Sequence, residues 1–142
     1  MQSDNIEAKE RILHASIQLF SDKGFDATSV TEIAQSADVT KPLIYYYFKS
    51  KEEILDSLVH SLLDKITSMT MDFVHANIVQ MIQAGRLDIE PDRLSFASEE
   101  DISYFLENGY KYFEKVLHFA LENRAIIRIL MFESLKSSKN HK

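Results

Sequence analysis

The 142-residue sequence contains no cysteine and no tryptophan, and it has only three glycines and two prolines. Without cysteine, these residues can form neither a disulfide nor a thiolate metal site. With so few turn-forming residues, they leave little room for a β-protein with many tight turns. Hydrophobic residues still make up 45% of the chain, which is enough to bury a sizeable core. The composition therefore favours an all-α fold.

A long apolar run is also missing. The longest candidate, residues 126–132, is interrupted by Arg128, and the polar N-terminus lacks the apolar segment of a signal peptide. We expect a soluble, cytoplasmic protein that makes no use of a membrane.

Patterns that support catalysis are absent as well. The five histidines show no H-x-x-x-H or H-E-x-x-H spacing, and there is no G-x-S-x-G motif or phosphate loop. We therefore expect no enzyme activity, no metal site and no cofactor.

Charge is distributed unevenly along the chain. The formal net charge is -6, yet residues 39–51 contain three lysines, Lys41, Lys49 and Lys51, and no acidic residue. A local basic surface in an acidic chain is typical of an element that contacts phosphate groups.

The residues around this basic stretch predict two short helices joined by a tight turn. Ser29 with Glu32 forms a capping-box pattern that opens the first helix. Thr40 can cap the second helix, and Pro42 is tolerated in its first turn because its missing N–H needs no partner there. The pair predicts a helix-turn-helix.

The second of these helices carries three consecutive tyrosines, which cannot share one buried face. At about 100° per residue, Ile44 and Phe48 fall together on one side of the helix. Tyr45 and Tyr46 fan over the other side with Lys41 and Pro42, and Leu43 and Tyr47 lie at the flank. We expect the first side to face a core and the second to face a ligand.

The run from Phe25 to Ile54, F-D-A-T-S-V-T-E-I-A-Q-S-A-D-V-T-K-P-L-I-Y-Y-Y-F-K-S-K-E-E-I, resembles the DNA-binding signature of the TetR family of bacterial transcriptional regulators. The match covers roughly residues 6–60. Pro42 stands where many members have glycine, and Tyr47 where many have histidine. Both departures bear on the operator sequence and leave the family assignment unchanged.

The resemblance implies two domains. Residues 1–49 would form a three-helix DNA-binding domain, and residues 50–142 would form a helical ligand-binding and dimerisation domain. Family members have further C-terminal helices that build the dimer, so we expect this second domain to be truncated at its C-terminus. The implied partners are a palindromic double-stranded operator, a second copy of the chain and a small-molecule effector.

The predicted DNA contacts come from the helix-turn-helix and the residues that flank it. Phosphate contacts position such a domain, whereas Lys41, Pro42 and Tyr45 are better placed to meet base edges. Lys51 lies at a helix N-terminus, where backbone donors already favour a phosphate. The full predicted set is Thr28, Ser29, Thr40, Lys41, Pro42, Tyr45, Tyr46, Tyr47, Lys49 and Lys51.

Further helices are predicted on both sides of this region. One would run from Asn5 to Lys23 and another from Ser50 to about Met71, with the helical pattern continuing to Ala84. Residues 85–97 are predicted to form a loop or a broken helix. A Ser-x-x-Asp cap at Ser98 would open a long helix ending near Asn123, and residues 125–135 would form the last helix.

The second half is rich in methionine and aromatic residues, which most often fill a helical core. The family resemblance implies a ligand pocket there, and the candidate residues are Met69, Phe73, Tyr104, Phe105, Tyr112, Phe113 and Met131. We expect a repressor that an effector releases from its operator. The alternative is a DNA-binding regulator that a partner protein controls through the C-terminal helices, without a small molecule.

Overall fold

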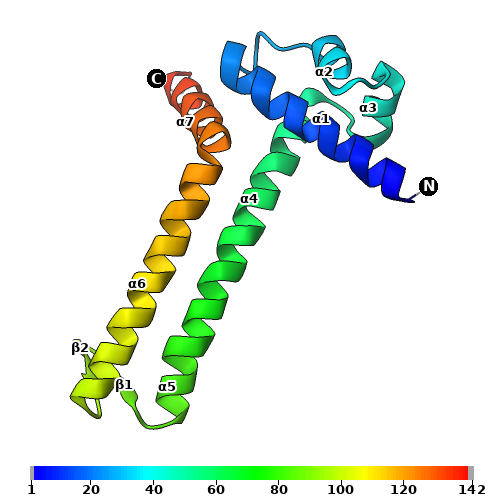
Figure 1. Cartoon of the computed structure of the whole chain (residues 1–142). Helices are drawn as coiled ribbons and strands as arrows, with labels where there is room; N and C mark the ends of the chain where they lie inside the picture. Colours follow the sequence, from blue (N-terminus) through cyan, green and yellow to red (C-terminus); the bar gives the residue numbers. More distant parts are fainter. Residues whose placement is uncertain (1, 141–142) are drawn as a thin grey trace. The chain divides into compact units, whose positions relative to one another are not determined.

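The computed structural model describes residues 2–140, with side chains from residue 4 onward, and it is mostly helical (Figure 1). Its elements are α1 Gln2–Lys23, α2 Val30–Ala37, α3 Lys41–Tyr47, α4 Lys51–Phe73, the π-helical segment η1 Val74–Val79, α5 Gln80–Gln83, β1 Leu87–Glu90, β2 Arg93–Phe96, α6 Glu99–Glu122 and α7 Arg124–Lys139. The predicted helical fold, with an N-terminal helix-turn-helix and a helical C-terminal region, is confirmed.

The chain divides into two compact units. Met1–Leu62 and Asn123–Lys142 form one, here called the N-terminal unit, and Leu63–Glu122 forms the other, here called the hairpin unit. These are packing units, whereas the boundary predicted at residue 49 separates two functions. That functional division remains a proposal.

The N-terminal unit has a continuous apolar core. Ile12, Ile33, Ile44 and Ile54 come from four different helices and are each at most 1% exposed. The buried stripe of α1 is centred on Ile12, whereas Ile6 near the start of the helix is 59% exposed. Aliphatic side chains from all four helices interlock here, and this fixes α2 and α3 against α1 and α4.

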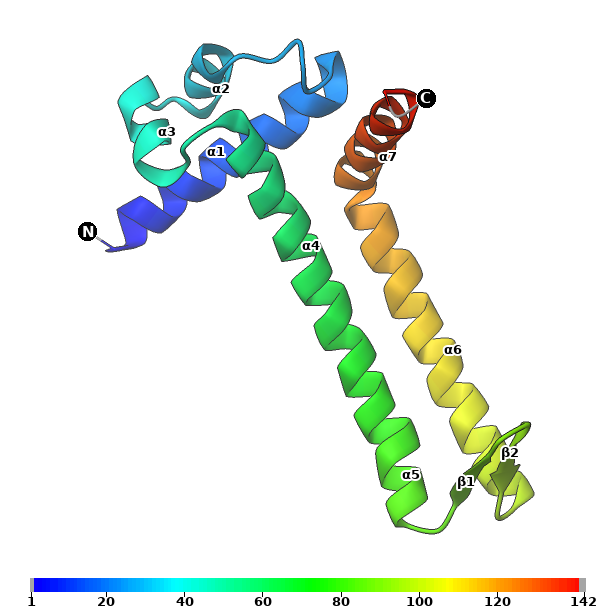
Figure 2. The same ribbon diagram turned by 180° about the vertical axis from the view of Figure 1, so that it is seen from behind.

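Helix α7 returns to the N-terminal unit and packs against α1 (Figures 1 and 2). Its Ile129 is 4% exposed and belongs to the same core as Phe20 and Phe25. Lys136 donates a hydrogen bond to the Asp26 carboxylate, with Nζ 3.0 Å from Oδ2. A segment more than 100 residues away in sequence thus completes the first core.

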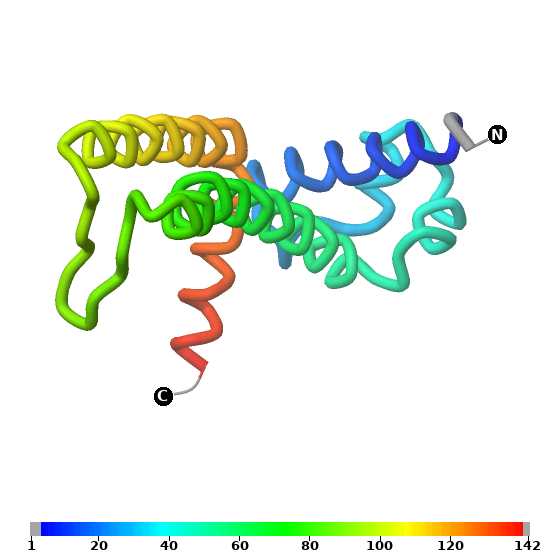
Figure 3. The backbone as a smooth tube through the Cα atoms, turned by 90° about the horizontal axis from the view of Figure 1, so that it is seen from below, coloured from blue at the N-terminus to red at the C-terminus, as the bar shows by residue number. Residues whose placement is uncertain are grey.

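Residues 85–97 form a β-hairpin, so the prediction of a loop or broken helix was wrong. β1 and β2 are antiparallel, with Leu87 opposite Phe96 and Glu90 opposite Arg93, and Figure 3 shows the chain turning back between α5 and α6. The register leaves Pro91 and Asp92 as a two-residue turn. A hairpin is stabilised by pairing across strands, which a search for helical periodicity does not detect.

The helix that begins at Lys51 continues through the π-helical segment η1 into α5, which ends at Gln83, in agreement with the helical pattern predicted to reach Ala84. Each π turn contains an extra residue, so the side chains after it point in a new direction. Among residues 2–140, no helix combines the length and apolarity needed to cross a membrane.

Candidate nucleic-acid interface

Two caps and one left-handed residue set the geometry of the helix-turn-helix. The Glu32 backbone N–H donates to Ser29 Oγ at 3.1 Å, and the Glu32 carboxylate accepts from the Ser29 backbone, so the predicted capping box is confirmed. Asp38 ends α2 with φ +53°, a conformation that short polar side chains tolerate. Thr40 Oγ1 then accepts from the Leu43 N–H and caps α3, as predicted.

Helix α3 has one buried face and one exposed face. Ile44 is 1% and Phe48 is 3% exposed, whereas Tyr45 is 49% and Tyr46 is 74% exposed. Lys41 and Pro42 are exposed beside these tyrosines, while Leu43 and Tyr47 are half-buried at the flank. The predicted division of the helix into a core face and a free face is confirmed.

The free face combines groups that suit the major groove of DNA. Thr40, Lys41, Pro42, Tyr45 and Tyr46 lie within two turns of one another and are all exposed. They offer an ammonium, phenol hydroxyls and apolar surface for phosphates, base edges and thymine methyls.

The ammonium groups of Lys41 and Lys49 remain available. Neither forms an ion pair or a side-chain hydrogen bond with any residue in the described part of the chain. The Lys49 backbone N–H donates to Glu53 Oε2 at 3.0 Å and so helps to start α4, while its side chain is exposed. Both lysines are free to pair with a phosphate.

Tyr47 differs from its two neighbours. Its hydroxyl donates to the Asn5 carbonyl at 3.0 Å, and its ring lies edge-on to that of Tyr46 with centroids 5.0 Å apart. Tyr47 therefore ties the end of α3 to the start of α1 and supports the more exposed Tyr46. A DNA contact by Tyr47 stays a prediction.

Lys51 has an internal role that the sequence did not reveal. Its Nζ donates to the carbonyls of Phe25, Asp26 and Thr28 at 2.7, 3.2 and 3.1 Å. The same ammonium lies over the Phe25 ring, 4.4 Å from its centroid. All three donors of the ammonium are used inside the protein, so Lys51 joins the start of α4 to the segment that precedes α2.

The hydroxyls of Thr28 and Ser29 both form hydrogen bonds within the protein. Thr28 is only 2% exposed, and its hydroxyl donates to the Gly24 carbonyl at 2.7 Å. Burial makes this side chain inaccessible to DNA, so we leave it out of the proposed contacts. Ser29 is exposed, although its hydroxyl already bonds to Glu32.

Two carboxylates, half-buried Glu32 in α2 and exposed Asp26 before it, have lowered pKa values. A hydrogen bond from Lys23 lowers the pKa of Glu32, and the Ser29 hydrogen bonds lower it further. A hydrogen bond from Lys136 lowers the pKa of Asp26 in the same way. These two carboxylates are therefore each paired with a lysine.

The predicted ligand residues do not all lie together. Phe73 stacks on Tyr112 with ring centroids 4.6 Å apart and also approaches Phe105 at 6.4 Å, all within the hairpin unit. Tyr104 instead lies against the Arg86 guanidinium, 4.5 Å from its ring centroid.

The remaining candidates divide between the two units. Met69 lines a cavity with Phe73 and Tyr112. Phe113 is 58% exposed, and Met131 is 62% exposed on α7, which belongs to the N-terminal unit. The structure thus brings together Met69, Phe73, Phe105 and Tyr112.

Sequence reasoning missed three polar residues near this cluster. Asn77, Lys111 and Lys115 line the same cavity as Phe73 and Tyr112. The spacing of the two lysines, one helical turn apart, was visible in the sequence, but which side of α6 they occupy was not. Among the described residues, no group of three or more histidine, aspartate or glutamate side chains is placed to hold a metal.

Comparison with known proteins gives consistent matches. Residues 12–58 match the model of the "Bacterial regulatory proteins, tetR family". The chain is 38% identical over 92 residues to a "Probable HTH-type transcriptional regulator YttP" of Bacillus subtilis, which covers 64% of this chain and 44% of that protein. It is 36% identical over 63 residues to IcaR of Staphylococcus aureus, a "negative transcriptional regulator" of the biofilm operon icaADBC. This alignment covers 44% of this chain and 34% of IcaR.

Solved structures show the same fold. A TetR family regulator from Marinobacter aquaeolei VT8 superposes with a TM-score of 0.60 at 19% identity, covering 91% of this chain and 55% of that one. The chain spans less than half the length of the curated relatives described above. The family model and the regulators that align with this region agree, and residues 12–58 form a helix-turn-helix domain of the tetR family of bacterial regulatory proteins.

Proposed function

We propose that this protein is a sequence-specific DNA-binding transcriptional regulator, a repressor that binds a palindromic operator. The observation that carries the proposal is the free face of α3, where Lys41, Pro42, Tyr45 and Tyr46 are exposed while Ile44 holds the helix in the core. In a helix-turn-helix the exposed residues at the start of the second helix are those that reach base edges in the major groove. The relative IcaR, described as a negative regulator, supports repression.

A palindromic operator requires a two-fold dimer. One recognition helix reads only a few base pairs, so useful specificity needs two half-sites about one helical turn of DNA apart, ~34–36 Å. Exposed apolar side chains on α6 and α7, among them Leu106, Leu121, Phe132 and Leu135, support the proposal of a second copy as partner.

Release by a small-molecule effector completes the proposal. The effector must bind the arrangement that cannot engage DNA more tightly than the one that can. Helix α4 begins at Lys51 beside the helix-turn-helix and ends at Phe73 beside the candidate ligand residues. A continuous helix between the two supports a mechanical link.

A partner protein in place of the effector is the second candidate. The exposed apolar side chains of α6 favour it, because Tyr110, Phe113 and Leu117 are 64, 58 and 48% exposed at helical spacing. A helix or groove of another protein could cover such a face.

Selection of binding sites from a random double-stranded library tests the function directly. We expect an enriched palindrome and its protection in footprinting. Tyr46→Ala should abolish the enrichment, and Ile89→Ala, which removes an exposed apolar side chain from β1, should leave it intact. Enrichment of no sequence by the parent protein, or equal effects of the two variants, would refute the proposal.

A further inference from the structure

Two adjoining cavities in the hairpin unit share Met69, Lys111 and Lys115. The larger measures about 780 Å³ and the smaller about 290 Å³. We call the two together the lysine groove. Its smaller part is also lined by Asp72, Phe73, Ala76, Asn77, Asn108 and Tyr112.

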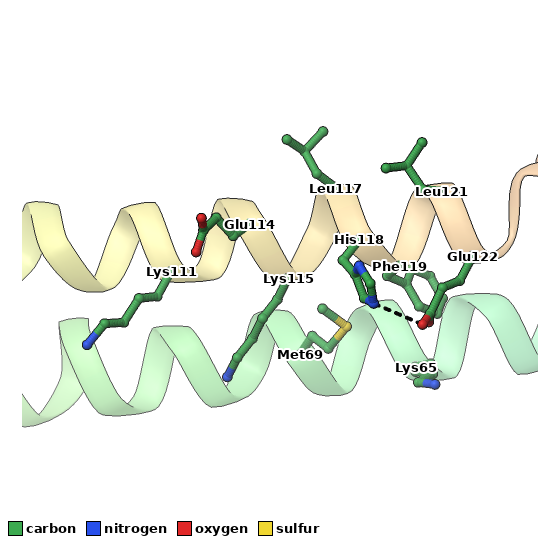
Figure 4. A pocket seen from close by; sticks show the side chains of 10 residues that line it. All are labelled: Lys65, Met69, Lys111, Glu114, Lys115, Leu117, His118, Phe119, Leu121 and Glu122. Atoms are coloured by element: carbon green, nitrogen blue, oxygen red, sulfur yellow. Dashed lines mark ion pairs between the residues drawn. The ribbon is translucent and has the colours of Figure 1, made fainter.

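The groove presents cations. Figure 4 shows Lys111 and Lys115 extending from α6 toward α4, on the opposite side of α6 from Leu117 and Leu121. Neither ammonium is within ion-pairing distance of a carboxylate in residues 4–140. Across the whole groove, Lys65, Lys111 and Lys115 are matched in number by Asp72, Glu114 and Glu122. In the smaller cavity Asp72 alone opposes two unpaired ammonium groups one turn apart, and this excess favours an anion there.

The wall of the smaller cavity is aromatic. Phe73 and Tyr112 stack with an interplanar angle of 23°, and the Tyr112 hydroxyl is fixed by a 2.7 Å hydrogen bond with Thr70. Met69 adds a polarisable thioether beside them. A flat apolar body fits such a wall better than a branched aliphatic one.

Asn77 supplies an independent observation. It is 6% exposed, and its Nδ2 donates to the Phe73 carbonyl at 3.1 Å, which fixes the orientation of the amide. Its Oδ1 is buried and has no hydrogen-bond partner. A buried acceptor without a donor is unfavourable, and a ligand that enters the groove and shifts the packing of η1 can supply that donor.

We propose that the lysine groove binds a small aromatic carboxylate that carries a hydroxyl or amino donor. The carboxylate pairs with Lys111 and Lys115, the ring packs on Phe73 and Tyr112, and the donor bonds to Asn77 Oδ1. A cavity of about 290 Å³ lies at the lower end of the range for ligand pockets, which selects a single-ring molecule. This inference rests on the proposed function, because it names the chemical class of the effector.

Direct calorimetric titration without DNA tests the proposal, with 3-(4-hydroxyphenyl)propanoate as the probe. Its methyl ether lacks the donor, and 3-(4-hydroxyphenyl)propan-1-ol lacks the charge. We expect each analogue to bind the parent chain about tenfold more weakly, since one hydrogen bond or ion pair is lost. In Lys111→Gln/Lys115→Gln the advantage of the acid over the alcohol should vanish, while Lys139→Gln, a charge change on α7, should preserve it.

Variants of Asn77 test whether the hydroxyl of the ligand donates a hydrogen bond to the Asn77 side chain. Asn77→Leu, or Asn77→Ala if the leucine variant does not fold, should bind the phenol and its methyl ether equally. No binding of the acid to the parent, or an acid preference that persists without both lysines, would overturn the inference. Because these titrations contain no DNA, their failure leaves operator selection as a separate test of the proposed function.

Discussion

The two units use their apolar residues in different ways. In the N-terminal unit, Ile12, Ile33, Ile44 and Ile54 from four helices are almost fully buried in one core. In the hairpin unit the fully buried apolar side chains are few, Met81, Leu87 and Phe119, within the described residues.

Helix α6 shows the contrast most clearly. Its outward side chains Leu106, Tyr110, Phe113, Leu117 and Leu121 are 48–64% exposed. The first unit thus completes its own core, and the second carries apolar surface suited to further contacts. We therefore expect the unit proposed to bind DNA to be less tolerant of substitutions at its apolar residues than the unit proposed to bind an effector.

The largest expected loss of stability comes from a substitution in the core of the N-terminal unit. Ile44→Ala should lower the free energy of unfolding by about 2–5 kcal/mol, because a buried large side chain is removed from a packed core. Phe113→Ala is the matched change in the hairpin unit and should cost far less, since that ring is 58% exposed. Denaturant unfolding of both variants measures the difference, and equal losses would show that the exposed face of α6 is packed in solution.

Lys51 provides a smaller effect within the same unit. Lys51→Met should destabilise the fold by about 1–3 kcal/mol, because three backbone carbonyls lose a charged donor. Lys49→Met, which alters an exposed side chain, serves as the control. Unfolding measured alongside DNA binding separates the roles, and unchanged stability with weakened binding would restore Lys51 as a phosphate contact.

The exposed lysine of α3 should affect binding and leave the fold intact. Lys41→Gln should reduce the slope of log affinity against log salt by about one per subunit, because one phosphate contact is lost. Lys139→Gln on α7 makes the same charge change away from the helix-turn-helix. Titrations at several salt concentrations provide the slopes, and equal slopes for Lys41→Gln and the parent would remove Lys41 from the interface.

The smallest effect concerns the attachment of α7 to the N-terminal unit. The pKa of Asp26 lies below its ordinary value of 3.8 because of the hydrogen bond from Lys136, so the pair stabilises the fold above that pH. This contribution should be lost as the pH falls through the lowered pKa. Lys136, whose pKa is raised chiefly by the hydrogen bond to Asp26, keeps its charge until well into the alkaline range.

Asp26→Asn tests this linkage. We expect the variant to be slightly less stable than the parent at pH 7, and the difference to shrink as the pH falls below 3.8 and the parent carboxylate loses its charge. Denaturation across this range measures the difference. A gap that is independent of pH would show that the ion pair does not hold α7 in place.

Local chemistry explains which features the sequence predicted well. The caps at Ser29, Thr40 and Ser98 depend on residues three positions apart, so they can be identified from the chain alone. The division of α3 into a buried and a free face follows from helical periodicity. Residue spacing is therefore sufficient to place the candidate DNA interface on α3.

Other features depended on contacts between distant segments. The hairpin pairs Leu87 with Phe96, and its short strands carry too weak an alternation to stand out beside long helices. A phosphate contact was predicted for Lys51 from its place at a helix N-terminus, and the carbonyls to which it donates lie 23 to 26 residues earlier in the chain. Only the folded chain shows that these carbonyls converge on one ammonium.

Short-range spacing and residue type specify the helices, their caps and the tetR-type helix-turn-helix. Which apolar and charged residues are free depends on contacts between distant segments. The tertiary structure buried Thr28, engaged Lys51, brought α7 onto α1 and placed Asn77 beside Lys111. The burial of a side chain and the pairing of a charged group depend on which segments are in contact, and short-range sequence patterns do not specify those contacts.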